Sequence, residues 1–172
     1  VGYYVSNVDW SESNGYENLI FKRKGFEHAF GSSLKWYKGK DNWLFLGNDI
    51  YQTVAKLRLA IEPSEKSISN LTARFTKLAK TGSESNTKIA LLVGPNKSSV
   101  YTEFLPDKMN PSDRRYSTIL TKPLSAIPNL TFVDPTDYLI DSKSTEGILY
   151  WRLGTHWNYK GGYLAFELLM GR

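Results

Sequence analysis

The sequence lacks several residue types that would otherwise widen the range of possible chemistry. It contains no cysteine, which excludes structural disulfides, thiolate metal sites and a cysteine nucleophile. It has two histidines, His28 and His156, so any imidazole acid–base chemistry has two candidates. Without cysteine, two distant histidines cannot build a metal cluster unless carboxylates supply nearly all the ligands. We therefore expect no metal site and no cofactor.

Long apolar runs are also missing. No stretch approaches the roughly 20 apolar residues that a membrane-spanning helix needs. What is present is the composition of one ordinary globular domain: 172 residues, 41% hydrophobic and 23% charged, which is enough to bury a sizeable core. The 22 basic and 17 acidic residues give a net charge of +5. This charge favours anionic partners such as uronic-acid polysaccharide, nucleic acid or phosphate, without choosing among them.

Hydrophobic patterning divides the chain into an irregular segment, residues 1–33, and a folded domain, residues 34–172. His28 lies in the irregular segment beside Glu27, with Phe26 and Phe30 nearby, and we expect it to pack. A short strand is predicted at 43–46, followed by a helix over 50–61 that Asp49 could cap. A second helix begins near Pro63. Its predicted apolar face consists of Ile68, Leu71, Phe75 and Leu78.

Three further strands are predicted at 88–93, 130–133 and 148–151. A short helix follows Asp134, and a final helix follows over 159–170. This alternation of helices and strands indicates an α/β layered fold. The apolar run 88–93 is typical of a strand inside a parallel sheet that is covered on both faces. Ligands bind at the carboxyl ends of such strands, so the loops after residues 93, 133 and 151 are the candidate site.

Two of these loops carry candidate functional side chains. His156 stands between a predicted strand and a predicted helix, where it could act as an acid or base, although a lone histidine is more often structural. The loop 94–99 offers Lys97 and Ser98, with Tyr101 just beyond. They could contact substrate or form a polar turn. The loop is not a phosphate-binding loop, because only the Lys-Ser pair of that motif is present.

Aromatic residues are abundant, with five tryptophans, eleven tyrosines and eight phenylalanines. Their flat rings can stack on the faces of sugars, although most rings in a domain of this size belong to the core. We expect one or two to lie at a binding surface. Trp157, beside His156, is the candidate that we choose.

Three blocks occur in a characteristic order: residues 39–49, residues 93–106, and Thr155-His156-Trp157-Asn158 followed by Gly161-Gly162-Tyr163. Together they make the chain resemble the SGNH-hydrolase-like domain of alginate O-acetyltransferase proteins, from about Phe26 to the carboxyl terminus. The resemblance implies a three-layer α/β domain with a mainly parallel sheet. It also implies transfer of acetyl groups to the hydroxyls of an exported polysaccharide, in the periplasm or cell envelope of a Gram-negative bacterium. A membrane-bound acyltransferase would supply the acetyl donor.

The family uses a Ser-His-Asp triad, and its histidine falls on His156. This residue would take the proton of a serine, so that the alkoxide could attack the acyl carbonyl. Lys97, Ser98 and Tyr101 match a loop near the family's active site, which implies contact with substrate. The positive net charge then favours an acidic polysaccharide acceptor, and the family blocks explain the chain better than nucleic-acid binding does.

The chain departs from the family pattern at two points. The family has Asp-Thr-His-Trp, whereas this sequence has Gly154 at the aspartate position; Asp134, Asp137 or Asp141 could substitute. The Gly-Asp-Ser block that carries the nucleophile occurs nowhere in the chain. We therefore expect a domain truncated at its carboxyl end. The alternatives are a noncatalytic carbohydrate-binding relative, or an esterase that passes the acetyl group to water.

Overall fold

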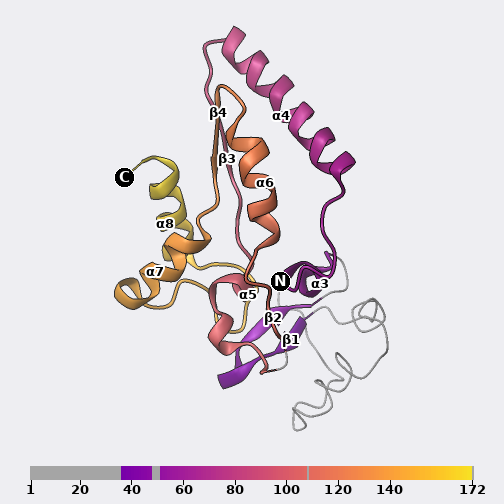
Figure 1. Ribbon diagram of the computed structural model, residues 1–172. Coiled ribbons are helices and arrows are strands. Elements are labelled where there is room, and N and C mark those ends of the chain that lie inside the picture. The colour runs from indigo at the N-terminus through magenta and orange to yellow at the C-terminus, as the bar shows by residue number, and fades with distance from the viewer. Residues whose placement is uncertain (1–35, 48–50, 108, 172) are drawn as a thin grey trace.

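The computed structural model describes residues 36–47, 51–107 and 109–171 (Figure 1). The predicted irregular segment, His28 and the capping role of Asp49 lie outside these residues. The described strands are β1 (Trp36–Lys38), β2 (Leu44–Leu46), β3 (Ile89–Leu92) and β4 (Leu130–Val133). The α-helices are α3 (Thr53–Leu57), α4 (Glu65–Glu84), α5 (Lys97–Val100), α6 (Tyr116–Ser125), α7 (Thr136–Glu146) and α8 (Tyr159–Leu169), and η1 (Lys40–Asn42) and η2 (Thr102–Phe104) are 3₁₀ turns.

The parallel pair β3 and β4 confirms two of the predicted strands. Ile89 pairs with Leu130 and Leu92 with Val133, so the carboxyl ends of both strands meet at one edge. Helices α4 and α6 lie along this pair (Figure 1). The expected burial of β3 on both faces is wrong for the described part of the chain, where the sheet has two strands and Ala90 is exposed.

Helix α4 has the amphipathic pattern that the sequence predicts, with one correction. It begins after Ser64, whose hydroxyl accepts a hydrogen bond from the Ser67 amide at 3.2 Å. Leu71 and Phe75 pack against the core beside β3 and β4, as expected. Leu78 is 48% exposed instead. The helix twist brings Ala79 to the packed face in its place, because that residue follows Phe75 by four positions.

The second core lies beneath the antiparallel pair β1 and β2. Its aromatic rings stack, with Trp43 lying 4.6 Å from the Tyr101 ring and 4.5 Å from the Phe104 ring, centroid to centroid. The predicted helix over 50–61 is shorter in the structure, where α3 ends at Leu57. This aromatic core supports the loop that follows β3.

The strand predicted at 148–151 does not form. Tyr150 makes an isolated antiparallel bridge with Trp157, and the Asn158 amide bonds to the Leu149 carbonyl at 2.8 Å. The segment therefore folds back on itself as a tight loop and does not extend as a strand. Its other backbone bonds go to distant side chains: the Leu149 amide donates to the Tyr101 hydroxyl, and the Trp151 carbonyl accepts from Lys97. In the described part of the chain, no helix combines the length and apolarity needed to span a bilayer.

Candidate functional site

Two loops meet beside the carboxyl end of β3, and Lys97 joins them. Its ammonium group donates hydrogen bonds to the carbonyls of three residues of the loop that carries His156: Trp151 at 2.9 Å, Arg152 at 3.0 Å and Gly154 at 2.6 Å. Lys97 is only 2% exposed. One buried cation therefore gathers three carbonyls and fixes the path of the chain just before His156.

The surroundings of Lys97 are aromatic. Its nitrogen lies 5.2 Å from the centre of the Trp43 ring and 5.1 Å from that of Phe45, distances at which a ring face attracts a cation. No described carboxylate lies within ion-pair distance of it. Burial lowers the pKa of Lys97 to about 8. The carbonyls and the rings are therefore what stabilises the charged amine.

Two tyrosines brace the same junction. The Tyr150 hydroxyl donates to the Pro95 carbonyl at 2.6 Å, and the Tyr101 hydroxyl accepts from the Leu149 amide at 2.8 Å. Burial raises the pKa of both phenols above the ordinary value, so both stay neutral at physiological pH. These hydroxyls hold backbone atoms of the two loops together.

Trp157 and the start of α8 complete the junction. The Trp157 ring covers Gly94, where an added Cβ would lie 3.4 Å from the ring. Asn158 caps α8 by accepting from the Gly161 amide at 3.0 Å. A Cβ at Gly161 would collide with the Leu149 carbonyl, so the close approach of helix and loop requires glycine there. The Gly-Gly pair inside a helical pattern was the sequence signal for this contact.

His156 itself is exposed. Its backbone carbonyl accepts from the Trp151 amide at 3.3 Å, and its Nδ1 lies 3.3 Å from the Thr155 hydroxyl. Trp151 and Tyr159 stand nearby, 54% and 91% exposed, with ring centres 6.3 Å apart in an edge-to-face arrangement. The imidazole is therefore open to a reactant while its backbone is held in place.

No described carboxylate lies within 4.0 Å of the imidazole. Asp134 bonds to the amide and hydroxyl of Thr136, and Asp137 pairs with Arg115 at 2.6 Å. Asp141 is exposed on α7. None of the three aspartates therefore partners His156 in this structure.

The residues predicted to contact substrate lie around the junction in different settings. The amine of Lys97 and the hydroxyl of Tyr101 are buried against backbone, and Trp157 is half-buried over Gly94. Ser98 is 2% exposed, and its hydroxyl has no hydrogen-bond partner. Its side chain lines a cavity to which Lys97 does not contribute. Contact of these four residues with substrate stays a prediction.

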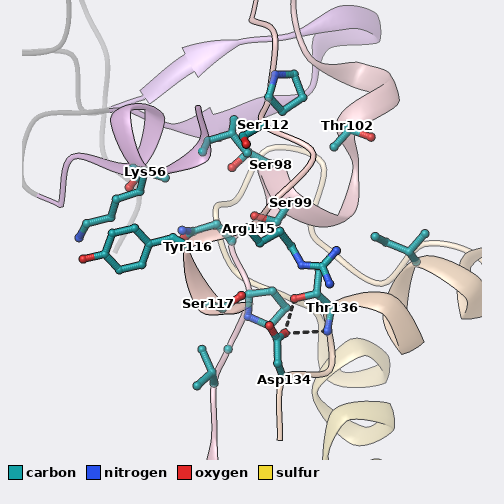
Figure 2. Close-up of a pocket in the computed structure, with 18 of the residues that line it drawn as sticks. Lys56, Ser98, Ser99, Thr102, Ser112, Arg115, Tyr116, Ser117, Asp134 and Thr136 are labelled. Atoms are coloured by element: carbon teal, nitrogen blue, oxygen red, sulfur yellow. Dashed lines mark hydrogen bonds between the residues drawn. The ribbon is translucent and has the colours of Figure 1, made fainter. Parts of the chain in front are cut away.

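The cavity has a volume of about 520 Å³ and lies where β3 and β4 end (Figure 2). A candidate site was predicted at these strand ends, but Arg115 and Lys56 were not predicted to be part of it. No local pattern signals them, because they reach the cavity from the segment before α6 and from α3. Asp134 was the lining residue that the sequence could indicate, because it is the first residue after β4. In the described ranges, no group of three acidic or histidine side chains could hold a metal ion.

Comparisons with known proteins extend this description. The family described as the SGNH hydrolase-like domain of acetyltransferase AlgX matches residues 37–172. Two structures of Bacillus cereus PatB1, one with a sulfonyl adduct, share the fold with TM-scores of 0.53 and 0.55, at 15% and 14% identity. Each match covers 79% of this chain and 41% of the PatB1 chain, so the chain spans about two fifths of that protein. No curated protein matches the sequence.

Proposed function

Because the chain belongs to the family of SGNH hydrolase-like domains of acetyltransferase AlgX, we propose that it is the histidine-bearing part of a polysaccharide O-acetyltransferase. The acceptor is an exported bacterial polysaccharide. The acetyl donor is supplied by a membrane-bound acyltransferase, and the reaction takes place in the periplasm or cell envelope. The basic net charge of +5 favours an acidic polymer as acceptor.

The observation that carries this proposal is that the backbone around His156 is held in place while its imidazole is exposed. Three hydrogen bonds from a buried lysine hold the preceding loop, a capped helix begins just after it, and the imidazole itself stays exposed. A backbone held in place beneath a solvent-exposed imidazole suits a general base. The base must meet the proton at a fixed position, and a bulky reactant must be able to reach it.

The proposed reaction runs in two steps. His156 takes the proton of a serine hydroxyl, and the serine oxygen attacks the acetyl carbonyl of the donor; the donor's leaving group departs with that proton. In the second step, His156 takes the proton of a sugar hydroxyl, which attacks the acetyl-serine. The serine recovers a proton and the sugar keeps the acetyl group. Among the described residues, no serine hydroxyl contacts the imidazole. The proposal therefore takes the nucleophile from outside the described residues.

Gly154 leaves His156 without the usual carboxylate partner. The Thr155 hydroxyl, 3.3 Å from Nδ1, is the described group whose oxygen can accept a hydrogen bond from Nδ1–H and so favour the tautomer in which Nε2 is free to act as the base. A neutral oxygen stabilises an imidazolium less than a carboxylate does. We therefore expect slow transfer from the natural sequence.

The full-length protein can be tested with an artificial acetyl ester, in the presence and absence of an oligosaccharide acceptor. Acetyl transfer, detected as a mass increase of the oligosaccharide, is expected for the natural protein and is lost in His156→Gln, which keeps a similar shape without the titratable ring. Transfer that persists in His156→Gln contradicts the proposal.

Two other functions are distinguished by the same assay. Ester hydrolysis that does not respond to the acceptor indicates an esterase, because the same chemistry can pass the acetyl group to water. Binding of the oligosaccharide without turnover of the ester indicates a noncatalytic carbohydrate-binding relative. The observation that favours this second candidate is the glycine at position 154.

A further inference from the structure

The cavity at the ends of β3 and β4 contains unusual unsatisfied polar groups. Four side-chain atoms of its lining residues are buried without a hydrogen-bond partner: Thr53 Oγ1, Ser98 Oγ, Arg115 Nε and Asp134 Oδ2. Thr53 and Ser98 are 3% and 2% exposed. Buried polar atoms are normally paired, since leaving one unpaired costs about 1–3 kcal/mol. All four atoms are closed to solvent in the unliganded fold, so a ligand in the cavity would meet them only after a small turn of the side chains. Four such atoms in the residues that line one cavity indicate that a ligand completes them.

The fold assembles these atoms from four separate segments. Thr53 begins α3, Ser98 lies in α5, Arg115 precedes α6 and Asp134 follows β4. Figure 2 shows Ser98, Arg115 and Asp134 among the side chains that line this cavity. In each of the two charged groups, one atom is bonded and another is left free. Asp134 Oδ1 accepts from the Thr136 amide at 3.0 Å, which leaves Oδ2 free. A terminal nitrogen of Arg115 pairs with Asp137 at 2.6 Å, which leaves Nε free.

The combination of free donors and acceptors limits the chemistry of the ligand. An anion would suit Arg115 but would be repelled by the carboxylate of Asp134. A cation would suit Asp134 but would face the N–H of Arg115. A hydroxyl group satisfies both, because it can donate to the carboxylate and accept from the guanidinium at once. Ser98 and Thr53 can take either role.

The remaining walls fit the less polar parts of a polyhydroxy compound. Leu57, Leu120 and Ile140 line the cavity together with the ring of Tyr116, and the Lys56 ammonium lies 5.4 Å from the centre of that ring. Ligand sites typically have volumes of about 300–1,000 Å³ and combine apolar walls with a few convergent polar groups. The cavity, at about 520 Å³, lies within this range.

We propose that this cavity is a binding subsite for an uncharged, hydroxyl-rich sugar unit, held by Asp134, Arg115 and Ser98. The choice of a sugar among hydroxyl-rich compounds rests on the proposed function. The cavity is separated from the His156 loop by one stretch of backbone, because Gly94 both lines the cavity and lies under the Trp157 ring. The subsite binds a unit beside the one that reacts, and its ligand is neutral even where the rest of the polymer is acidic.

Binding can be measured without any acetyl transfer. The probes are a neutral disaccharide, cellobiose, and an acidic one, digalacturonic acid, titrated into the isotope-labelled full chain and followed by the amide signals of Ser98, Ser99 and Thr136. Asp134→Asn replaces the unpaired oxygen and keeps the oxygen that holds the Thr136 amide. Ser98→Ala removes a hydroxyl that has no protein partner, so the fold is expected to tolerate it. Asp107→Asn is the matched control, a carboxylate-to-amide change at an exposed residue outside the cavity.

The proposal expects saturable shifts with cellobiose and affinity losses of about tenfold in both cavity variants, the equivalent of one hydrogen bond each. The Asp107→Asn control should bind as the natural protein does, and melting temperatures identify any variant that fails to fold. Absence of cellobiose binding means that the cavity holds water alone and overturns the proposal. Tighter binding of the uronate, or equal binding by the cavity variants, overturns it as well. Loss of acetyl transfer with binding intact would refute the proposed function and leave this subsite standing.

Discussion

Replacement of Lys97 by methionine tests how the loop that carries His156 is held. The substitution keeps a long side chain among the aromatic rings but removes the three hydrogen bonds of 2.6–3.0 Å to the loop carbonyls. A hydrogen bond to a charged group contributes about 1.5–3 kcal/mol. The net loss is smaller than the sum of three such bonds for three reasons. The bonds share one ammonium, two of the acceptor residues are exposed to water, and the substitution removes the cost of burying a charge. We therefore expect a net loss of roughly 2 kcal/mol of unfolding free energy.

For a chain of this length, that loss lowers the melting temperature by about 4–8 °C. It should also raise hydrogen exchange at the Trp151 and Gly154 amides, whose bonds close the loop, while the amides of α4 exchange as before. Lys88→Met, at an exposed lysine, is the matched control. An unchanged melting temperature together with unchanged exchange of the loop amides would refute the anchoring role of Lys97.

The pH dependence of stability provides a second readout of the same residue. Burial lowers the pKa of Lys97 from 10.5 to about 8 in the folded protein. Between these two values the unfolded chain binds a proton at this site that the folded chain does not, so raising the pH favours the folded state. We expect the stability of the natural protein, relative to Lys97→Met, to rise from pH 8 to pH 10.5. A relative stability that falls over this range would show that the folded protein holds the Lys97 proton more tightly than the unfolded chain does, and it would contradict the lowered pKa.

Three further substitutions test contacts made with the backbone. Gly161→Ala should lower the unfolding free energy by about 2 kcal/mol or more, because its Cβ would collide with the Leu149 carbonyl. Gly162→Ala should instead be neutral or stabilising by up to about 1 kcal/mol, because its nearest neighbour, the Trp157 ring, is 3.4 Å away and alanine favours a helix. Urea unfolding of the pair measures both, and equal effects would contradict the close packing of loop and helix. Asn129→Ala should cost about 2 kcal/mol in the same assay, since it removes two side-chain hydrogen bonds to backbone carbonyls and a residue suited to positive φ. An unchanged midpoint would contradict that estimate.

Local sequence pattern predicted the helices and strands whose residue types and spacing carry a clear signal. The apolar runs of β3 and β4, the amphipathic helix α4 and the final helix α8 all appear where they were expected. Helix α6 was missed because Pro123 lies inside it and polar residues precede it. The segment 148–151 looked like a strand because it is apolar. Leu149 and Tyr150 are instead part of the aromatic core, and the backbone turns back to pair with residues 156–158.

The candidate site shows the same division between local and distant contacts. The family blocks identified His156 and the loop that carries Lys97, and the rule on strand ends pointed to the region of Asp134. The partners of these groups are far away in sequence: the carbonyls that Lys97 holds lie 54 to 57 residues downstream. Arg115 likewise reaches the cavity from a segment with no recognisable motif. Such contacts arise from the packing of distant segments, which periodicity and spacing do not encode.

Position 154 tests most directly whether His156 is the base of an acetyl transfer. A Cβ there would lie 3.0 Å from the Cβ of Trp151, so both Gly154→Asp and Gly154→Ala require the loop to shift by a few tenths of an ångström. Gly154→Ala makes the same steric demand without the carboxylate and is therefore the matched control, and the melting temperatures of both variants show whether the loop admits the change. Loss of the carboxylate costs about 10⁴ in rate in a comparable triad.

The decisive measurement is the rate of acetyl transfer to an oligosaccharide by the full-length protein and these two variants. Gly154→Asp should raise the rate by tenfold or more, Gly154→Ala should not, and the gain should disappear when His156→Gln is added. No gain with a folded Gly154→Asp variant would contradict the account and favour a carbohydrate-binding role.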